Sequence, residues 1–578
     1  MKRTDKQGFT IVELVIVIAV IAILAAVLIP NISKLVRKAN ESSDLSLVRN
    51  LNTALTVENK DYATAHEAFE AVKDAGYDLT KIEAKADKNK ILYDSENQCF
   101  AYLKDGKLEY YPNTYKTKLT PNDYYKLWSI ETVAKENGEY TYSVYWNGAD
   151  NAAVTVKGVG FDAGNKTTAS VEYRGANVGR DVVIRTNGGT LTIDAPKDVV
   201  RHFYGVDKVI INHINRASYH ENGTVAVSMI VKDGHVVVEE GARVKELSIP
   251  ATATDDAVSV SIKTGSVVNT AVVDDTNATV EIVSGAKVGL IVGETTNISG
   301  SGASEAKENA AAKTTVATFA ELVAKIADSN CKYIVLTDNI TATEALTIKR
   351  DVIIDGGNFE LVGSGLTGSN SRAINIGWYE SGIVAPAIEV TIKNLKVTGP
   401  TGGDSRGINI ADANTTVNLF DSTVTAGYYA INITGSGKNT KLNISGSTVS
   451  GWAALNIWAS YHEINVSNST LIGINDKTYN EDGWNNFATI CFEADTTDAT
   501  AEHSFSTIVR IKGSVIKAIE QTEGNIQNLV CFNYNASQSS VGNYIEFSGC
   551  SFESVSGHEY SFNDAPNTIK IDGVEISK

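Results

Sequence analysis

Hydrophobic residues follow several different periodicities along the chain, and each periodicity predicts a different element. Residues 9–29 form an almost unbroken apolar run in which only Thr10 and Glu13 are polar. As a helix, this run spans about 32 Å, which matches the hydrocarbon core of a bilayer. In residues 31–57 the apolar positions recur every three or four residues, so the helix is predicted to continue in amphipathic form to residue 57.

The next segment, residues 58–125, has the pattern of a small α+β unit. A second amphipathic helix is predicted to end near Gly76, because glycine commonly closes helices. Residues 90–112 then alternate between apolar and polar positions around Asp105-Gly106, which predicts an antiparallel hairpin.

Beyond residue 125 the helical pattern gives way to strands. In residues 126–298, Gly241, Gly265 and Gly285 each open a similar unit, GARV, GSVV and GAKV. Strand-rich units repeated at this spacing predict a β-solenoid. Residues 299–313 are small and polar, and are predicted to be a linker.

Residues 314–578 contain the most regular repeat. After a short amphipathic helix predicted at 317–328, three apolar residues recur at relative positions 0, 2 and 7. The starts step by 22 to 27 residues between Val390 and Ile464, as expected for coils of a parallel β-helix, and the 45-residue step to Val509 is predicted to hold two coils. The eight starts are Val352, Val390, Val417, Leu442, Ile464, Val509, Ile545 and Ile569. The predicted fold class is therefore multidomain and mainly β, with a long N-terminal helix, a small α+β head and parallel β-solenoids.

A second motif accompanies these coils. Asn375, Asn409, Asn432 and Asn456 each stand between aliphatic residues in sequences such as AINI and GINI. Because successive strand residues face opposite ways, the four amides are predicted to stack as a ladder along the solenoid.

Composition narrows the possible partners. The formal net charge is −17, which argues against nucleic acid as a partner. The five cysteines are scattered without C-x-x-C or zinc-like spacing, so the fold is predicted not to depend on disulfides.

A single carboxylate inside the apolar run needs explanation, because burying it in a membrane costs about 2.5–3.5 kcal/mol. The sequence around Glu13 is GFTIVE, preceded by the basic residues Lys2, Arg3 and Lys6, and Pro30 closes the run. This N-terminus resembles those of type IV pilins and type II secretion pseudopilins.

The resemblance implies that residues 1–8 are a leader. A prepilin peptidase is expected to cut after Gly8 and methylate Phe9, and Glu13 is expected to serve assembly with other pilin subunits. Pro30 stands where the family's helix-kinking proline stands. The precursor would be a single-pass protein of the cytoplasmic membrane, and residues 58–125 would form the pilin head. The mature chain would lie in an extracellular filament on the cell surface. An ordinary signal anchor is the alternative.

Residues 314–578 resemble the right-handed β-helix of pectate-lyase-like proteins, some of which act on polysaccharides. Arg510-Ile511-Lys512 matches only a short piece of a polygalacturonase-like pattern, without its paired aspartates and histidine. The acid pairs Asp255-Asp256 and Asp274-Asp275 lie in the other predicted solenoid. No enzymatic activity is therefore expected.

Aromatic residues are unusually dense in the second predicted solenoid. They could line one groove and bind host or environmental glycans by stacking, or they could be buried under loops, and the sequence favours neither. These residues are Trp378, Tyr379, Trp452, Trp458, Tyr461 and Trp484.

Metal and cofactor sites are not predicted. The four histidines His202, His213, His220 and His235 match no compact metal motif. Residues 475–483, NDKTYNEDG, fail the spacing of a calcium-binding loop.

The predicted function is a minor or tip subunit of a pilus-like filament that displays solenoids for adhesion. Two alternatives stay open: a pseudopilin of a secretion or competence system, and a filament-borne polysaccharide lyase or hydrolase.

Overall fold

The structure is a computed structural model that divides into two compact units, Met1–Val133 with Val144–Ala149, and Ala134–Ser143 with Asp150–Lys578. It describes residues 11–57, 65–78, 82, 84–86, 89–94, 99–104, 107–110, 127–136, 139–146, 153–159, 169–174, 181–185, 189–203, 205–214, 218–251, 258–368, 370–377, 386–458, 460–475, 488–493, 506–520, 528–532, 534–535, 538–539, 542–554, 560–561 and 567–576.

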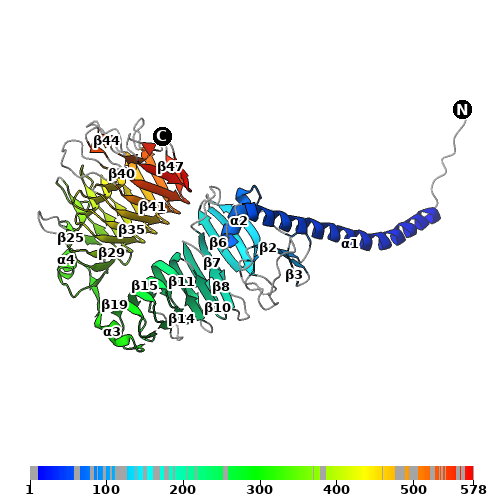
Figure 1. Cartoon of the computed structure of the whole chain (residues 1–578), viewed down its shortest axis with the longest axis horizontal. Helices are drawn as coiled ribbons and strands as arrows, with labels where there is room; N and C mark the ends of the chain where they lie inside the picture. Colours follow the sequence, from blue (N-terminus) through cyan, green and yellow to red (C-terminus); the bar gives the residue numbers. More distant parts are fainter. Residues whose placement is uncertain are drawn as a thin grey trace. The chain divides into compact units, whose positions relative to one another are not determined.

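The first unit is built on the long helix α1 (Ile11–Val57), which curves along its length (Figure 1). Val48, Leu51 and Leu55 in its C-terminal half are buried. The rest of the head comprises α2 (Ala65–Asp74) and the antiparallel strands β1 (Lys90–Asp94), β2 (Cys99–Lys104) and β3 (Lys107–Tyr110). The predicted long helix and α+β head therefore agree with the structure.

Gly76 closes α2 as predicted. Its φ of 92° lies in the left-handed region, where a side chain would be strained. The Gly76 amide donates to Lys73 O at 2.8 Å, and the Tyr77 amide donates to Val72 O at 3.0 Å. These two bonds satisfy carbonyls at the end of the helix.

Antiparallel pairing persists further into the chain than predicted. β4 (Leu127–Glu136), β5 (Glu139–Trp146), β6 (Ala153–Val159) and β7 (Ala169–Arg174) come first, and β6 pairs with β7 antiparallel. Parallel stacking begins only with the β7–β9 pair. The predicted solenoid start at residue 126 is too early, because strand composition does not reveal pairing direction.

The first solenoid has two strands per coil, and each belongs to a different sheet. Within each sheet, strands of successive coils lie side by side along the solenoid (Figure 1). One parallel sheet has seven strands, and the other stacks the alternating strands β9 to β21. The strands of the first sheet are β8 (Asp181–Arg185), β10 (Val199–Phe203), β12 (Ser218–Glu221), β14 (His235–Val238), β16 (Ser259–Ile262), β18 (Thr279–Ile282) and β20 (Ile298–Ser299). Those of the second are β9 (Thr190–Asp194), β11 (Gly205–His213), β13 (Thr224–Val231), β15 (Arg243–Ile249), β17 (Val267–Val273), β19 (Lys287–Gly293) and β21 (Ala310–Ala311).

The predicted glycine repeat marks one corner of this solenoid. Gly241, Gly265 and Gly285 have φ values of 83°, 79° and 84°, so each turns the chain in the left-handed region before a strand of the second sheet. The strands that follow are in register, because Arg243 pairs with Val267, which pairs with Lys287. The solenoid prediction is confirmed in this region.

The predicted linker at 299–313 is instead part of the fold. It contains β20, the short helix α3 (Ala303–Glu308) and β21, and β22 (Lys313–Val316) begins the second solenoid. Ala303 and Ala306 are buried, and the Gly302 amide donates to Ile282 O at 2.8 Å. The small residues that resembled a linker are the ones that let this segment pack closely on the last coil.

The second solenoid has three strands per coil, arranged in three parallel sheets. Sheet 1 contains β22, β23 (Tyr333–Leu336), β26 (Val352–Asp355), β29 (Glu389–Lys393), β32 (Thr416–Phe420), β35 (Lys441–Ser445), β38 (Glu463–Ser467), β41 (Ile508–Lys512), β46 (Tyr544–Ser548), β49 (Thr568–Ile571) and the antiparallel β50 (Val574–Glu575). Sheet 2 contains β24 (Ile340–Thr341), β27 (Glu360–Val362), β30 (Lys396–Thr398), β33 (Thr423–Thr425), β36 (Thr448–Gly451), β39 (Thr470–Asn475), β42 (Val515–Glu520) and β47 (Ser551–Ser554). Sheet 3 contains β25 (Leu346–Ile348), β28 (Arg372–Ile376), β31 (Arg406–Ile410), β34 (Tyr429–Ile433), β37 (Ala453–Ile457), β40 (Ala488–Phe492), β43 (Asn528–Phe532) and β48 (Tyr560–Ser561). A small hairpin joins β44 (Tyr534–Asn535) to β45 (Gln538–Ser539).

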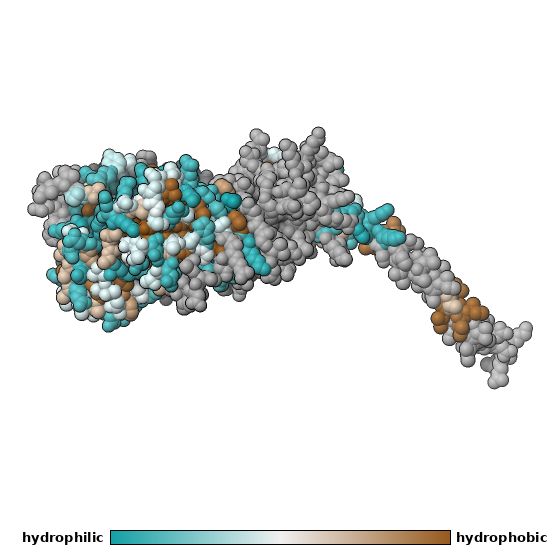
Figure 2. Space-filling model, turned by 90° about the horizontal axis from the view of Figure 1, so that it is seen from below, coloured by the Kyte–Doolittle hydropathy of each residue, from teal (hydrophilic) through white to brown (hydrophobic). Residues whose placement is uncertain are grey.

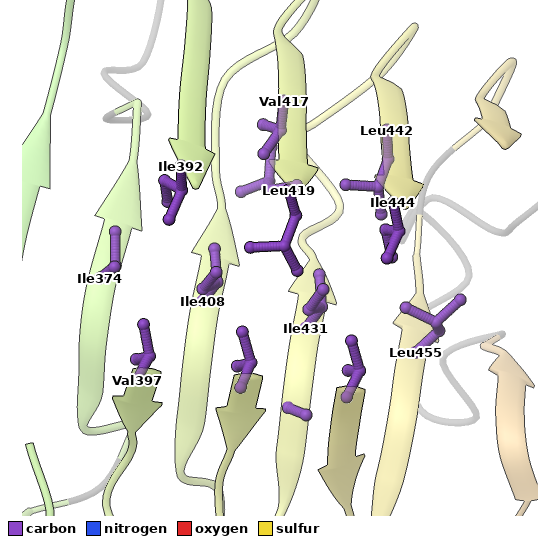
Figure 3. Packing of buried hydrophobic residues seen from close by; sticks show 14 of the residues in the cluster. Ile374, Ile392, Val397, Ile408, Val417, Leu419, Ile431, Leu442, Ile444 and Leu455 are labelled. Atoms are coloured by element: carbon purple, nitrogen blue, oxygen red, sulfur yellow. The ribbon is translucent and has the colours of Figure 1, made fainter. Parts of the chain in front are cut away.

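All three sheets contribute to one apolar interior. Figure 3 shows side chains of sheet 1 and sheet 3, such as Leu419 and Ile431, pointing into the same space between the strands. The predicted helix before the first coil is α4 (Phe319–Ala327), whose buried Leu322 and Ile326 belong to this core. Thr318 caps α4 by accepting a hydrogen bond from the Glu321 amide.

The predicted repeat frame is confirmed at all eight starts, which are register partners in one column of sheet 1. The residue at relative position 7 departs from the predicted frame in two coils. In the first, Leu361 rather than Phe359 pairs with Val397, and in the last, Ile576 lies beyond β50. The 45-residue step does not hold two coils, since Ile464 pairs directly with Val509. That coil is a single one that carries long insertions between its strands.

Candidate functional site

The predicted processing and assembly residues lie at or near the start of α1. Gly8 and Phe9 fall outside the described residues, and Glu13 and Pro30 lie within α1, which is described there by its backbone. Among the residues whose side chains are described, no helix is long and apolar enough to cross a membrane.

Apolar side chains of α1 remain uncovered in the isolated chain. Figure 2 shows a brown, hydrophobic patch on the helix. The exposed apolar residues of α1 are Val15, Ile16, Ile18, Val20, Leu35 and Val36. Leu35 and Val36 belong to the apolar pattern of residues 31–57, but they are 67% and 53% exposed, so the core of the head begins only further along the helix. Exposed apolar surface of this kind needs another surface to cover it.

Two buried polar residues fix α1 to the head. The Asn52 side chain donates to Phe100 O at 2.8 Å and accepts from the Phe100 amide at 2.6 Å, so it pairs with β2 as a strand would. The Asp44 carboxylate accepts from the Ala86 amide at 3.1 Å and from Tyr102 Oη at 3.0 Å. Burial together with Asp44 raises the pKa of Tyr102. Neither polar residue was predicted from the sequence, although each interrupts the apolar stripe of the helix.

The aromatic residues proposed for a groove divide into three groups. Trp378, Tyr379 and Trp484 lie outside the described residues. Trp452 is 1% exposed, so the burial alternative applies there and its ring cannot line an open groove. Trp458 is half-buried and Tyr461 is 52% exposed.

Trp452 instead belongs to a stack beside sheet 3. Its ring lies 4.4 Å from that of Tyr428 at an interplanar angle of 26°, and Tyr428 lies 4.2 Å from Tyr429. Tyr428 is the half-buried member of the three, so it presents the accessible edge of this stack.

The predicted asparagine ladder is confirmed. Asn409 Nδ2 donates to Asn375 Oδ1, and Asn432 Nδ2 donates to Asn409 Oδ1, each at 2.8 Å. The amides of Asn432 and Asn456 also lie 2.8 Å apart, and all four residues are buried. The ladder therefore satisfies a column of buried amides from one coil to the next.

Two further ladders were missed, although the sequence carries their signals. Asn418, Asn443 and Asn465 follow the first residue of the repeat frame and bond from coil to coil at 2.9 and 3.2 Å. Serines in the turns after the sheet 1 strands, such as SGST at 445–448, form the other ladder. Each serine hydroxyl accepts a hydrogen bond from the backbone amide of the equivalent serine one coil earlier, at 3.1 Å in each pair. The serines of this ladder are Ser422, Ser447, Ser469 and Ser514.

All five cysteines are buried, and none of them forms a disulfide. Cys491 and Cys531 continue the column of the asparagine ladder on the next two coils of sheet 3. Their mutual hydrogen bond and burial raise the pKa of Cys491. Burial raises the pKa of Cys550 to about 12, so neither group is an activated thiolate.

Two arginines stand at the start of adjacent strands of sheet 3. Arg372 and Arg406 are register partners, and both are half-buried. Burial is the main cause that lowers the pKa of each guanidinium. The signal in the sequence is a repeated S-R-x-I-N-I, at 371–376 and 405–410, which was not predicted to form a site.

The four histidines of the first solenoid do not meet at one site. His202 is buried with its Nδ1 2.9 Å from Glu221 Oε1, whereas His220 Nδ1 lies 2.6 Å from Glu239 Oε1 nearer the surface. His235 bonds Ser259, and the exposed His213 lies beside Asp194. Within the described ranges, no group of three or more His, Cys, Asp or Glu side chains is placed to hold a metal ion. Of the calcium-loop candidate at 475–483, only Asn475 is described, at the end of β39, and the rest lies outside those ranges.

Charged residues join the two solenoids within the second unit. Lys393 Nζ lies 2.6 Å from Glu246 Oε1 and 3.5 Å from Asp355 Oδ2, with Lys393 and Glu246 only 11% and 12% exposed. Lys245 also pairs with Glu389. Beside these pairs is a cavity of about 770 Å³ whose lining carries both charge signs.

The residues considered for catalysis do not assemble an active site in the described part of the chain. Asp274 forms an ion pair with Lys313 at 2.7 Å, and Asp275 is buried and accepts from the Asn277 amide. Asp255-Asp256 lies outside the described residues, while Arg510 and Lys512 flank the buried Ile511 on sheet 1.

Comparisons with known proteins identify two modules. Residues 3–29 match the family model described as "Prokaryotic N-terminal methylation motif", and residues 313–427 match "Putative pectate lyase-like adhesive domain". The chain therefore carries a prepilin-type methylation motif and a pectate-lyase-like adhesive module.

Two curated relatives resemble the N-terminal region. The chain is 34% identical over 79 residues to "Type II secretion system core protein G" of Escherichia coli, which covers 13% of this chain and 54% of the relative. It is 61% identical over 38 residues to "Type IV wide pilus major component PilA4" of Thermus thermophilus, and this alignment covers 7% of this chain and 29% of the relative. The chain thus spans about half the length of these relatives or less. No solved structure matches it.

Proposed function

We propose that this chain is a pilin-like subunit that carries a pair of β-solenoids on a surface filament. A prepilin peptidase cuts the membrane-anchored precursor after Gly8 and methylates Phe9, and α1 then packs against other pilin subunits. The observation that carries the proposal is the methylation motif at residues 3–29, joined directly to a helix with exposed apolar side chains. In a filament, neighbouring helices would cover those side chains.

Glu13 sets the order of assembly in this proposal. Its carboxylate is costly in lipid, and the new α-amino group of Phe9 in a neighbouring subunit would offset that cost. A subunit in the correct register gains this partner, whereas a subunit in the wrong register keeps an unpaired charge.

The test is Glu13→Ala, with Glu308→Ala on the exposed end of α3 as the matched control. Glu13→Ala should leave cleavage after Gly8 intact but remove the chain from sheared filaments, while Glu308→Ala should be processed and incorporated normally. Normal incorporation of Glu13→Ala would contradict the proposed role.

The solenoids act as a non-enzymatic adhesive in this proposal. The family description of residues 313–427 as adhesive supports it. The large solenoid cargo favours a minor or tip position, since a packed shaft would be crowded by a copy on every subunit. Gold labelling along the whole shaft would contradict the tip position, and release of unsaturated or reducing ends from a polysaccharide would contradict the non-enzymatic role.

A second candidate is a pseudopilin of a secretion system, which the similarity to a type II secretion core protein favours. The two candidates differ in where the processed chain resides. A pilus subunit is released with sheared filaments, whereas a pseudopilin stays with the cell envelope after shearing.

A further inference from the structure

Two positive charges lie together on sheet 3. Arg372 and Arg406 are in register on adjacent coils, which places their strands about 4.8 Å apart. Neither guanidinium forms an ion pair with any carboxylate in the described part of the chain. The charge of Asp404 favours the charged form of Arg406, but burial outweighs it and the pKa of Arg406 stays lowered. Like charges at this range repel each other and half-burial adds a desolvation cost, so an anion that joins the pair would stabilise it.

The hydrogen bonds of the pair leave donors available. Arg372 donates from Nε to Asn370 O at 3.0 Å and from Nη1 to Asn375 Oδ1 at 3.1 Å. Arg406 donates from Nη1 to Asn370 Oδ1 at 2.6 Å and to Asp404 O at 2.8 Å. Arg406 Nε is buried with no acceptor among the described residues. Since a guanidinium has five N–H groups in a fixed fork, each arginine keeps donors for an oxyanion such as a carboxylate or a sulfate.

The asparagine ladder orients this site. Asn375 Oδ1 accepts from both Arg372 Nη1 and Asn409 Nδ2, so the first rung of the ladder holds the guanidinium in place. Three more coils of hydrogen-bonded amides stand behind that rung. Side chains held in this way lose little freedom when a ligand binds, which favours affinity.

An aromatic platform adjoins the arginines on the next coil. Tyr429 is the register partner of Arg406, whose Cζ lies 5.8 Å from the centre of the tyrosine ring. The half-buried Tyr428 beside it is backed by Trp452. Guanidinium groups near an accessible ring edge suit a sugar that carries an anionic group, because the ring packs against the C–H groups of the sugar and the arginines bind the charge.

We propose that Arg372, Arg406 and Tyr428 form a binding site for a glycan bearing carboxylate or sulfate groups. The inference rests on the proposed adhesive function and names its ligand class. The chain has a net charge of −17, so general attraction to polyanions is unfavourable and binding must depend on this local pair. Nucleic acid is disfavoured for the same reason, because its affinity comes from many phosphate contacts.

The experiment measures binding of the full chain, from sheared filaments or in detergent, to three immobilised polymers: polygalacturonate, dextran sulfate and neutral dextran. We expect binding to at least one anionic polymer, no binding to dextran, and weakening as salt rises. Arg372→Gln and Arg406→Gln should each weaken binding about tenfold or more, since charged hydrogen bonds are lost. Tyr428→Ala should weaken it less.

The matched control is Arg510→Gln, which removes the same charge from the same solenoid but on sheet 1. Thermal unfolding of each variant shows whether it is folded. The variants Arg372→Lys and Arg406→Lys form a second pair, which keeps the positive charge but loses the forked N–H donors of the guanidinium. Preference for polygalacturonate or dextran sulfate identifies the anionic group. Equal binding by wild type and both arginine-to-glutamine variants, or binding to dextran alone, would overturn the site.

The same samples separate this inference from the function on which it rests. If the chain is found in filaments but shows no arginine-dependent binding, only the glycan site fails. If arginine-dependent binding is present but the chain never enters filaments, the filament proposal fails and the site stands.

Discussion

The two solenoids keep their coils in register in different ways. Both stack parallel strands and turn at residues with positive φ, such as Gly265 in the first and Asn394 in the second. In the first solenoid, which has two sheets, a buried polar pair, His202 and Glu221, is confined to two neighbouring strands. In the second, which has three sheets, buried amides bond through successive coils.

The difference shows what keeps each solenoid in register. The asparagine ladder repeats over the four coils from Asn375 to Asn456, so its hydrogen bonds favour one register there. The serine ladder crosses the coil from Ile464 to Val509, which keeps its register despite long insertions. The first solenoid lacks such a ladder in its described interior, and its register depends on apolar columns and on glycines at the corners.

Breaking the buried pair of the first solenoid should have the largest effect. Glu221→Leu leaves the donors of His202, Tyr219 and the Gly223 amide without an acceptor, so we expect a loss of about 3–5 kcal/mol. Hydrogen exchange of peptides from residues 181–311 across a urea series measures the loss in this solenoid alone.

The control for that change is Glu239→Leu, which removes the more exposed partner of His220 and should cost less than about 1 kcal/mol. The double variant His202→Leu with Glu221→Leu should recover only part of the stability, because Tyr219 Oη and the Gly223 amide still lack their acceptor. A single variant as stable as wild type would show that the pair does not organise this core.

Breaking the ladder of the second solenoid should have a somewhat smaller effect. Asn432→Ala leaves amide groups of Asn409 and Asn456 unpaired in the core, which should cost about 3 kcal/mol. Exchange of peptides from residues 386–475 should accelerate, and the first solenoid should be unaffected. Asn465→Ala, at the half-buried end of the second asparagine ladder, should cost less than about 1 kcal/mol, so equal effects of the two variants would contradict the role of burial.

Acid should weaken the contact between the solenoids, with the smallest effect of the three. Burial opposes the charge of Glu389, but its ion pair with Lys245 across the contact and a hydrogen bond from Asn418 together outweigh burial, so the pKa of Glu389 is lowered. A lowered folded-state pKa gives stability that is present above the ordinary carboxyl value and is lost as pH falls through the folded-state value. The loss therefore begins below about pH 4.

Small-angle scattering of the full chain between pH 7 and pH 3 measures this loosening. Lys245→Met should remove most of this pH dependence and loosen the contact by about 1 kcal/mol at pH 7, because it leaves the partly exposed Glu389 without its cation. An unchanged pH profile in Lys245→Met would place the acid sensitivity elsewhere.

The sequence predicted the structure best where packing requires an apolar residue at regular intervals along the chain. The eight frame starts predicted the core column of sheet 1, because every coil needs an apolar residue there. Chain length misled at the 45-residue step, since an insertion and a second coil contain the same number of residues. The small residues of 299–313 misled because they serve close packing as well as linkers.

The candidate site was less predictable for physical reasons. A tryptophan at a strand edge can face solvent or the solenoid, so Trp452 could not be placed from its sequence. Arg372 and Arg406 are 34 residues apart, and only the register of their coils brings them together. Pairing of this kind follows from the coil lengths, which the long insertions obscure.

The central claim is that α1 enters a filament after the leader has been removed. Intact mass and N-terminal sequencing of the chain sheared from the cell surface test it most directly. We expect a chain that begins at Phe9 with one methyl group on its amine and lacks residues 1–8. A chain that still begins at Met1 and is found only in the membrane fraction would contradict the claim.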